Sequence, residues 1–110
     1  MSMATSGADN GLQEVRVREV IGAGGGLSPE NGPVLAARVQ DEVLKGEVVV
    51  DFSGAGTLSS GFTNAFVLEL RRFRPLDEWK RLLRFEGLDS VGRLVLSRSL
   101  RAVRELQEGR

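Results

Sequence analysis

The fold is decided by the stretch Glu47-Val-Val-Val-Asp-Phe-Ser-Gly-Ala-Gly-Thr-Leu-Ser-Ser-Gly-Phe62. Its β-branched start is too short for a helix and lies between Gly46 and Gly54, so the pattern predicts a buried strand. A loop of small residues follows, and Ser59 and Ser60 stand where an apolar helix begins. Ligand and regulatory sites of open α/β sheets gather where strands end and helices begin. We therefore expect the functional surface in this loop.

The chain before this stretch predicts one more strand and one more helix. Apolar and charged residues alternate over residues 14–21, which is typical of a half-exposed strand, and the glycine-rich run 22–26 ends it. A helix follows, because Leu35, Val39 and Val43 are spaced by four on one face. Together these elements form the first strand-then-helix unit.

The chain after Phe62 predicts a helix, a strand and a last long helix. Helix 62–73 carries an apolar stripe at helical spacing: Phe62, Ala65, Phe66, Leu70 and Phe73. Residues 79–85 are expected to form a third strand. Asp89 or Ser90 is expected to cap the last helix. Its predicted apolar face consists of Val91, Leu94, Val95, Ala102, Val103 and Leu106.

These elements add up to three strand-then-helix units joined by short links. Because crossovers between parallel strands are right-handed, the pattern predicts an α/β fold with a small, largely parallel sheet. A chain of 110 residues suits a single core. We expect a flexible N-terminal leader over residues 1–13 and one domain over residues 14–107.

Composition excludes most catalytic chemistry. The chain has no Cys and no His, which removes disulfides, the usual zinc sites, cysteine nucleophiles and triads that use imidazole as the base. We therefore expect a protein that is not an enzyme, with no cofactor and no metal. The first 11 residues lack the basic start and the apolar stretch of a signal peptide, and no window resembles a membrane span. A cytoplasmic protein without membrane contact is expected.

Charge divides the chain into two halves. Residues 1–70 hold 4 basic and 9 acidic side chains, a net charge of −5, whereas residues 71–110 hold 11 basic and 6 acidic ones, a net charge of +5. Arg93, Arg101 and Arg104 share one side of the expected last helix and form a candidate basic patch. Such a patch suits nucleic acid or an acidic protein, although solvated arginines are common. Aromatic side chains for stacking on bases are scarce.

The central stretch resembles a known family. Gly46-Glu-Val-Val-Val-Asp-Phe-Ser-Gly54 followed by Leu58-Ser-Ser-Gly-Phe62 is similar to the signature of the STAS-like domain of unknown function, in which a helix-opening Phe follows the glycine by eight residues. The glycine turn of that family before its first helix is matched by Gly32. The resemblance covers about residues 14–107 and implies a bacterial regulatory protein with a STAS-like fold.

The wider relatives of that family are the STAS anti-sigma factor antagonists, in which an anti-sigma kinase phosphorylates a serine at this helix start. The resemblance places Ser60 at the phosphoacceptor position. It also implies a protein partner that is a kinase-like ATPase or an anti-sigma-type regulator. Ser59 stands where an Asp usually precedes the acceptor, and Gly61 where a second serine is frequent.

Each candidate residue also has a purely structural interpretation. Ser59 or Ser60 could simply cap the helix, a role that serine often fills. Asp51 could bind a metal, but a lone carboxylate at a strand end more often accepts N–H bonds from the following turn. The glycine run 22–26 matches neither the dinucleotide-binding pattern nor a P-loop, which favours a connector.

We therefore hypothesise a non-catalytic protein-interaction module that is switched by phosphorylation of Ser60. The expected partner-binding loop consists of Asp51, Ser53, Gly54, Thr57, Ser59 and Gly61. The alternative is a nucleic-acid-associated accessory subunit that uses the basic C-terminal half. Self-association through a sheet edge or a helix is a further open alternative.

Overall fold

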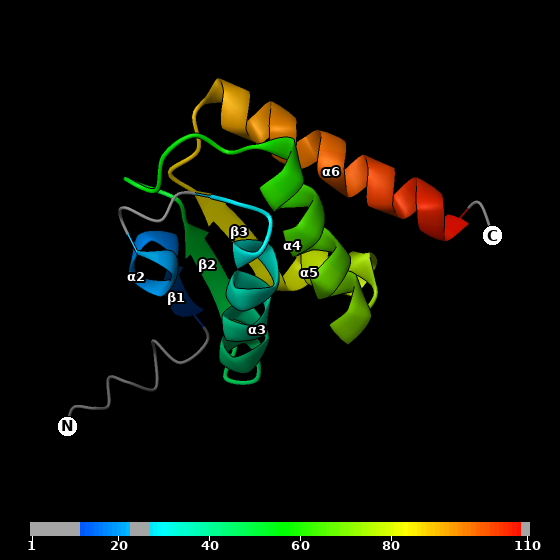
Figure 1. Cartoon of the computed structure of the whole chain (residues 1–110). Helices are drawn as coiled ribbons and strands as arrows, with labels where there is room; N and C mark the ends of the chain where they lie inside the picture. The colour runs from blue at the N-terminus through cyan, green and yellow to red at the C-terminus, as the bar shows by residue number, and fades with distance from the viewer. Residues whose placement is uncertain (1–11, 23–26, 109–110) are drawn as a thin grey trace.

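The computed structural model describes residues 12–22 and 27–108, which form an α/β fold with a three-stranded, all-parallel sheet (Figure 1). Helices alternate with the strands along the chain, so the predicted fold class is confirmed. Residues 1–11 of the expected leader and residues 23–26 of the glycine run lie outside the described residues. The last two residues assigned to the leader, Leu12 and Gln13, belong to the first strand.

The strands are β1 (Leu12–Arg16), β2 (Glu47–Asp51) and β3 (Leu83–Glu86), in the order β1-β2-β3. The central position of β2 explains its apolar sequence, because Val48 and Val50 are fully buried. The predicted strand over this stretch is confirmed.

Register brings the three strand ends together at one edge of the sheet. Arg16 pairs with Asp51, and Asp51 with Glu86, so one residue from the end of each strand lies in a single row. The loop that follows β2 leaves the sheet from the middle of this row. The sheet thus positions the stretch that the sequence singled out.

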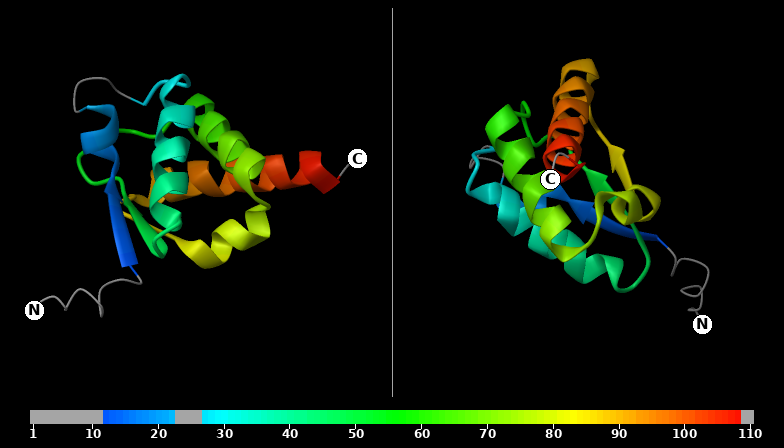
Figure 2. Two further views of the ribbon diagram at one scale, coloured as in Figure 1. Left: turned by 90° about the horizontal axis from the view of Figure 1, so that it is seen from below. Right: turned by 90° about the vertical axis from the view of Figure 1, so that its right-hand side faces the viewer.

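One face of the sheet is covered by α3 (Asn31–Val43) and α4 (Ser60–Phe73), which pack against each other (Figure 2). The phenylalanine rings of Phe62 and Phe66 are stacked with their centroids 6.1 Å apart. The two helices can approach closely because Gly32 has no side chain. A Cβ at this position would lie 2.7 Å from the Phe66 backbone nitrogen, which is too close. Glycine is therefore required where α3 crosses α4.

The predicted stripes of α3 and α4 are largely confirmed. Leu35, Val39 and Val43 of α3 are buried, as are Phe62, Phe66 and Leu70 of α4. Phe73, which was expected in the α4 stripe, is 42% exposed, because it is the last residue of the helix and has no neighbouring layer above it.

The first predicted strand is too long. It ends at Arg16, and residues Val17–Ile21 form the short helix α2. Val17 is buried and Val20 and Ile21 pack against the core, which is the three- and four-residue spacing of a helix. The alternating pattern hid this change of period, because Val15 and Val17 suit either structure.

The third predicted strand is wrong over its first half. Residues Leu76–Leu82 form the helix α5, and β3 begins only at Leu83. Pro75 precedes α5 and Asp77 lies in its first turn, where a carboxylate interacts favourably with the helix dipole. Trp79 fixes the helix, because its indole Nε1 donates to the Leu70 carbonyl at 2.6 Å.

The last helix, α6 (Ser90–Glu108), begins as predicted but buries a different face. The Asp89 carboxylate accepts the Gly92 N–H at 2.7 Å and caps the helix. Three members of the predicted stripe are 50–64% exposed: Val91, Leu94 and Leu106. Val103 is buried as predicted, but Leu96 and Ser99 are buried as well, so the helix is rotated from the expected orientation. On this buried face, Ser99 makes polar contacts with α4.

The opposite face of the sheet is lined by charged side chains. Glu14 of β1 and Arg84 of β3 flank Val49 of β2 in the register, and both are exposed. Arg84 also lies 3.7 Å from Glu47 across the two strands. Among the described helices, none is long and apolar enough to cross a membrane.

Candidate functional site

The loop between β2 and α4 begins with a turn that Asp51 stabilises. The Asp51 carboxylate accepts the Ser53 backbone N–H at 2.9 Å, and this bond lowers the pKa of Asp51 below its ordinary value. The Ser53 hydroxyl and the positive charge of Arg16 lower the pKa further. The structural interpretation of Asp51 as an acceptor for the following turn is thus confirmed. Ser53 and Gly54 lie exposed at its tip.

The turn after β3 supports this loop from the side. The Phe52 N–H donates to the Glu86 carbonyl at 2.8 Å, which extends the pairing of β2 with β3 by one bond. Gly87 then passes so close that a Cβ would lie 2.4 Å from the Ser53 nitrogen and 2.7 Å from Asp51 Oδ1. Its φ of +77° is also a conformation that favours glycine. In the sequence, Gly87 is simply the residue that follows the third predicted strand by two positions, and nothing there indicates this close approach.

Ser59 is the cap of α4. Its hydroxyl accepts the Phe62 N–H at 3.2 Å and donates to the Leu27 carbonyl at 3.1 Å. It therefore satisfies a free N–H of the first turn and ties the helix start to the segment before α3. The sequence left the cap open between Ser59 and Ser60, and the geometry assigns it to Ser59.

Ser60 is the first residue of α4 and is exposed. Its hydroxyl makes no hydrogen bond within the described part of the chain, whereas its backbone carbonyl accepts from the Thr63 hydroxyl at 3.2 Å. Gly61, also exposed, follows it beside Pro29, whose Cγ would lie 3.0 Å from a Cβ at that position. A bulkier residue at Gly61 would press on Pro29.

Most of the predicted partner-binding loop is exposed, and so is Ser60, the predicted phosphoacceptor. The exposed residues of this loop surface are Ser53, Gly54, Thr57, Ser59, Ser60 and Gly61, whereas Asp51 is half-buried. Leu58 holds this surface to the body of the protein, because it is only 5% exposed and belongs to the hydrophobic core. The anchor could have been found from the sequence, since it is the one large apolar residue between Ser53 and Gly61.

A polar contact between α4 and α6 was missed. Thr63 Oγ1 lies 2.7 Å from Ser99 Oγ, and Ser99 donates to Asn64 Oδ1 at 2.7 Å. Both Thr63 and Ser99 are buried. The Thr63 hydroxyl also lies 3.0 Å from the Ser59 carbonyl, so it connects α6 to the first turn of α4. In the sequence, Ser99 only interrupts the apolar positions of the last helix, and nothing there indicates a contact with α4.

The predicted basic patch lies on α6 and not on the β2–α4 loop. Arg93 and Arg101 are exposed, and the side chain of Arg104 is 40% exposed. Arg104 lies 3.4 Å from Asp77 of α5, in an exposed ion pair. The three arginines were predicted to share a side of the helix, and all three line the cleft between α6 and the α5–β3 segment.

The described residues contain no group of three acidic side chains close enough to hold a metal ion. Comparisons with known proteins give no assignment, because no family model, no curated protein and no solved structure matches the chain. A function must therefore be argued from the geometry of this small α/β domain with its three-stranded parallel sheet.

Proposed function

We propose that this domain is a STAS-like protein-interaction module without catalytic activity. Its partner is a kinase-like ATPase or an anti-sigma-type regulator that contacts the β2–α4 loop, residues 53–61, and the exposed side of α4. Support comes from the resemblance of the central stretch and from the three strand-then-helix units of the fold. The loop also lies at the carboxyl edge of the sheet, where α/β proteins concentrate their sites.

The observation that carries the proposal is that Ser59 and Ser60 have different structural roles: Ser59 caps α4, whereas Ser60 is exposed as the first residue of the helix. The Ser59 hydroxyl makes two hydrogen bonds as the helix cap, so modifying it would break bonds that stabilise the start of α4. The Ser60 hydroxyl is exposed one residue further along. A phosphate on Ser60 would sit at a helix N-terminus, where free N–H groups stabilise negative charge.

Phosphorylation of Ser60 acts by changing the charge of the contact surface. The modification adds about −1.5 to −2 charges at pH 7. Residues 53–61 carry no charged side chain, so this loop part of the contact surface is uncharged before modification and strongly negative afterwards. The result is release of a partner that fits the unmodified loop.

The experiment is affinity capture from the cells that make this protein. Tagged wild-type, Ser60→Ala and Ser60→Asp chains are compared by quantitative mass spectrometry. We expect wild type and Ser60→Ala to retain an ATP-binding partner, and Ser60→Asp to retain at least tenfold less. Equal capture by Ser60→Ala and Ser60→Asp would remove the switch.

Ser90 offers a matched control. It is an exposed serine at the first position of α6, and a different residue, Asp89, caps that helix. Ser90→Asp therefore adds the same charge at the same place in another helix. We expect capture by Ser90→Asp to equal that of wild type.

A further inference from the structure

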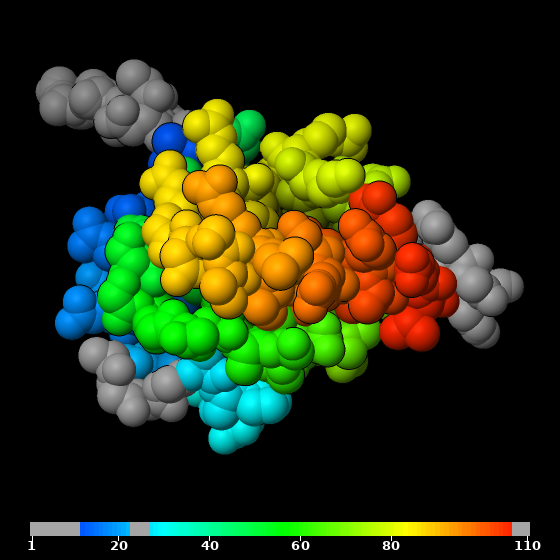
Figure 3. All heavy atoms as spheres, turned by 90° about the horizontal axis from the view of Figure 1, so that it is seen from above, coloured from blue at the N-terminus to red at the C-terminus, as the bar shows by residue number. Residues whose placement is uncertain are grey.

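The helix α5, the strand β3 and one side of α6 border a groove. Two cavities of about 220 Å³ and about 370 Å³ meet at Ser97 and Leu100, which line both. A smaller cavity beneath them shares Leu100 with both. We call the continuous depression formed by these three cavities the basic groove. Figure 3 shows α6 crossing this face of the molecule between α4 and the α5–β3 segment.

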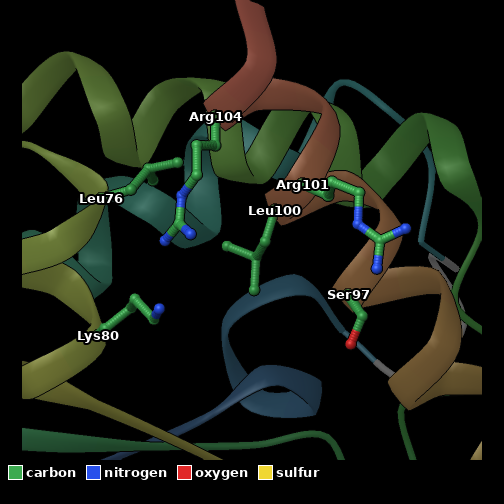
Figure 4. Close-up of a pocket in the computed structure, with 6 residues that line it drawn as sticks. All are labelled: Leu76, Lys80, Ser97, Leu100, Arg101 and Arg104. Carbon is green, nitrogen blue, oxygen red and sulfur yellow. The ribbon is translucent and has the colours of Figure 1, made fainter. Parts of the chain in front are cut away.

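The floor of the basic groove is apolar. Leu76 of α5, Phe85 of β3 and Leu96 and Leu100 of α6 supply most of it. Leu76 and Leu96 are buried, whereas Phe85 and Leu100 are only partly buried and present carbon surface to the groove. Figure 4 shows Leu76 and Lys80 on one side and Leu100, Arg101 and Arg104 on the other.

The rim of the basic groove is positive. Its charged lining residues are Lys80, Arg93, Arg101 and Arg104. No acidic residue among the described ones lines any of the three cavities. Asp77 lies beside Arg104 at 3.4 Å, but its side chain is 85% exposed, and such surface ion pairs contribute little. An incoming carboxylate can therefore replace it.

The described residues of the groove lack the aromatic surface on which the bases of single-stranded nucleic acid stack. Trp79 is the one tryptophan of the chain, yet it is only 2% exposed and its Nε1 is bonded to the Leu70 carbonyl. Proteins that bind single-stranded nucleic acid without base readout present aromatic faces along a positive track. Phe85 is the one partly exposed aromatic side chain among the described residues that line the groove, and a single ring does not make a track of aromatic faces. An apolar floor of leucines and Phe85 between basic side chains instead matches a peptide that carries both apolar and acidic residues.

We propose that the basic groove binds an acidic, amphipathic segment of a partner protein. Leucine-like side chains of that segment fill the floor around Leu100, and its carboxylates pair with Lys80 and Arg101. The lining from Arg93 to Arg104 extends over about 16 Å of helix, enough for three turns of a helical peptide. This inference does not depend on Ser60, because no residue of the β2–α4 loop lines the groove.

The test is a peptide-display selection on the whole chain. A library of random 16-residue peptides is selected on the wild-type protein, and the enriched peptides are titrated by fluorescence anisotropy. We expect an acidic consensus with apolar residues three or four positions apart. We also expect at least tenfold weaker binding to the double variant Lys80→Glu/Arg101→Glu, and amide shifts centred on residues 97–101 in NMR spectra.

Matched variants distinguish binding in the groove from a general effect of the net charge of the protein. Arg81→Glu/Arg98→Glu makes the same change of charge on the same two helices, at exposed residues that do not line the groove, and we expect it to bind like wild type. Ser97→Trp fills the groove without changing its charge and should also abolish binding. Thermal melts confirm that each variant is folded.

Three outcomes would overturn the inference. The selection could enrich no peptides, or only neutral and basic ones. The enriched peptides could bind both double variants equally. A 20-nucleotide single-stranded RNA could bind with the sensitivity to Lys80→Glu/Arg101→Glu that the peptides lack, which would assign the patch to nucleic acid and show steep weakening with salt.

Discussion

The β2–α4 loop and the basic groove lie on one small domain but are held in different ways. The loop is fixed by hydrogen bonds between near neighbours, such as the one from the Ser53 N–H to Asp51, and its surface is polar with a single carboxylate. The groove is formed by three elements that meet mainly through packing, with one exposed ion pair between Arg104 and Asp77, and its rim carries four cations. A surface of low charge changes greatly when one phosphate is added, whereas a cationic surface attracts acidic partners at all times. We infer that the two surfaces serve different partners.

The largest expected effect is that of a substitution, Gly87→Ala, which disrupts the β2–α4 loop and leaves the basic groove intact. Gly87→Ala places a Cβ 2.4 Å from the Ser53 nitrogen in a backbone with φ of +77°. We expect it to lower the free energy of unfolding by about 3 kcal/mol, of which about 1–2 kcal/mol is the backbone conformation alone. Urea denaturation measures the loss. Capture of the loop partner should fall, while binding of groove peptides should not change.

Gly56→Ala is the control for this prediction. Gly56 has a φ of +101° in the same loop region, but a Cβ there would meet nothing within 4 Å. It should therefore cost only the backbone term, about 1–2 kcal/mol. Equal destabilisation by Gly87→Ala and Gly56→Ala would show that the contact with Ser53 does not hold the loop.

A smaller effect is expected at the contact between α4 and α6. Ser99→Ala removes the hydroxyl that lies 2.7 Å from both Thr63 Oγ1 and Asn64 Oδ1. The cost should be about 1 kcal/mol, because Thr63 can still donate to the Ser59 carbonyl and Asn64 is exposed. Thermal denaturation measures it. A loss above about 3 kcal/mol would mean that the buried Thr63 finds no other partner.

The smallest expected effect concerns acid and the turn at Asp51. The pKa of Asp51 is lowered in the folded state, so its contribution to stability is present above the ordinary aspartate pKa of about 3.9 and is lost as pH falls through the folded-state value. The stability of wild type should therefore drop more than that of Asp51→Asn when pH is lowered from about 5 to about 2. Parallel loss in both proteins would show that the Ser53 N–H does not favour the charged carboxylate.

The same two regions show what the sequence could predict. The β2–α4 loop was predicted because strand, acceptor, glycines and cap lie within sixteen consecutive residues, Glu47 to Phe62, and act on one another locally. Even there, the choice between Ser59 and Ser60 as the cap needed the position of the Leu27 carbonyl, which comes from a distant segment.

The groove could not be predicted, because α5 and the orientation of α6, which form two of its walls, were predicted wrongly. Residues 79–82 were expected in a strand, yet they belong to α5, which supplies Lys80 to the rim. The predicted face of α6 included Val91, Leu94 and Leu106, which are exposed, whereas Ser99, which was not part of that face, is buried. Apolar periodicity reports which residues can be buried, but it does not report a polar contact between two helices. Only the basic residues themselves could be read from the sequence.

The most direct measurement is the affinity of the captured loop partner for the chain with and without phosphate on Ser60. The phosphorylated chain is made by incorporating phosphoserine at that position, and a chain with phosphoserine at Ser90 serves as the control. Isothermal titration should give at least tenfold weaker binding when Ser60 is phosphorylated and unchanged binding when Ser90 is. Equal affinity for the unmodified and the Ser60-phosphorylated chains would contradict the proposal that this loop is a phosphorylation-controlled contact surface.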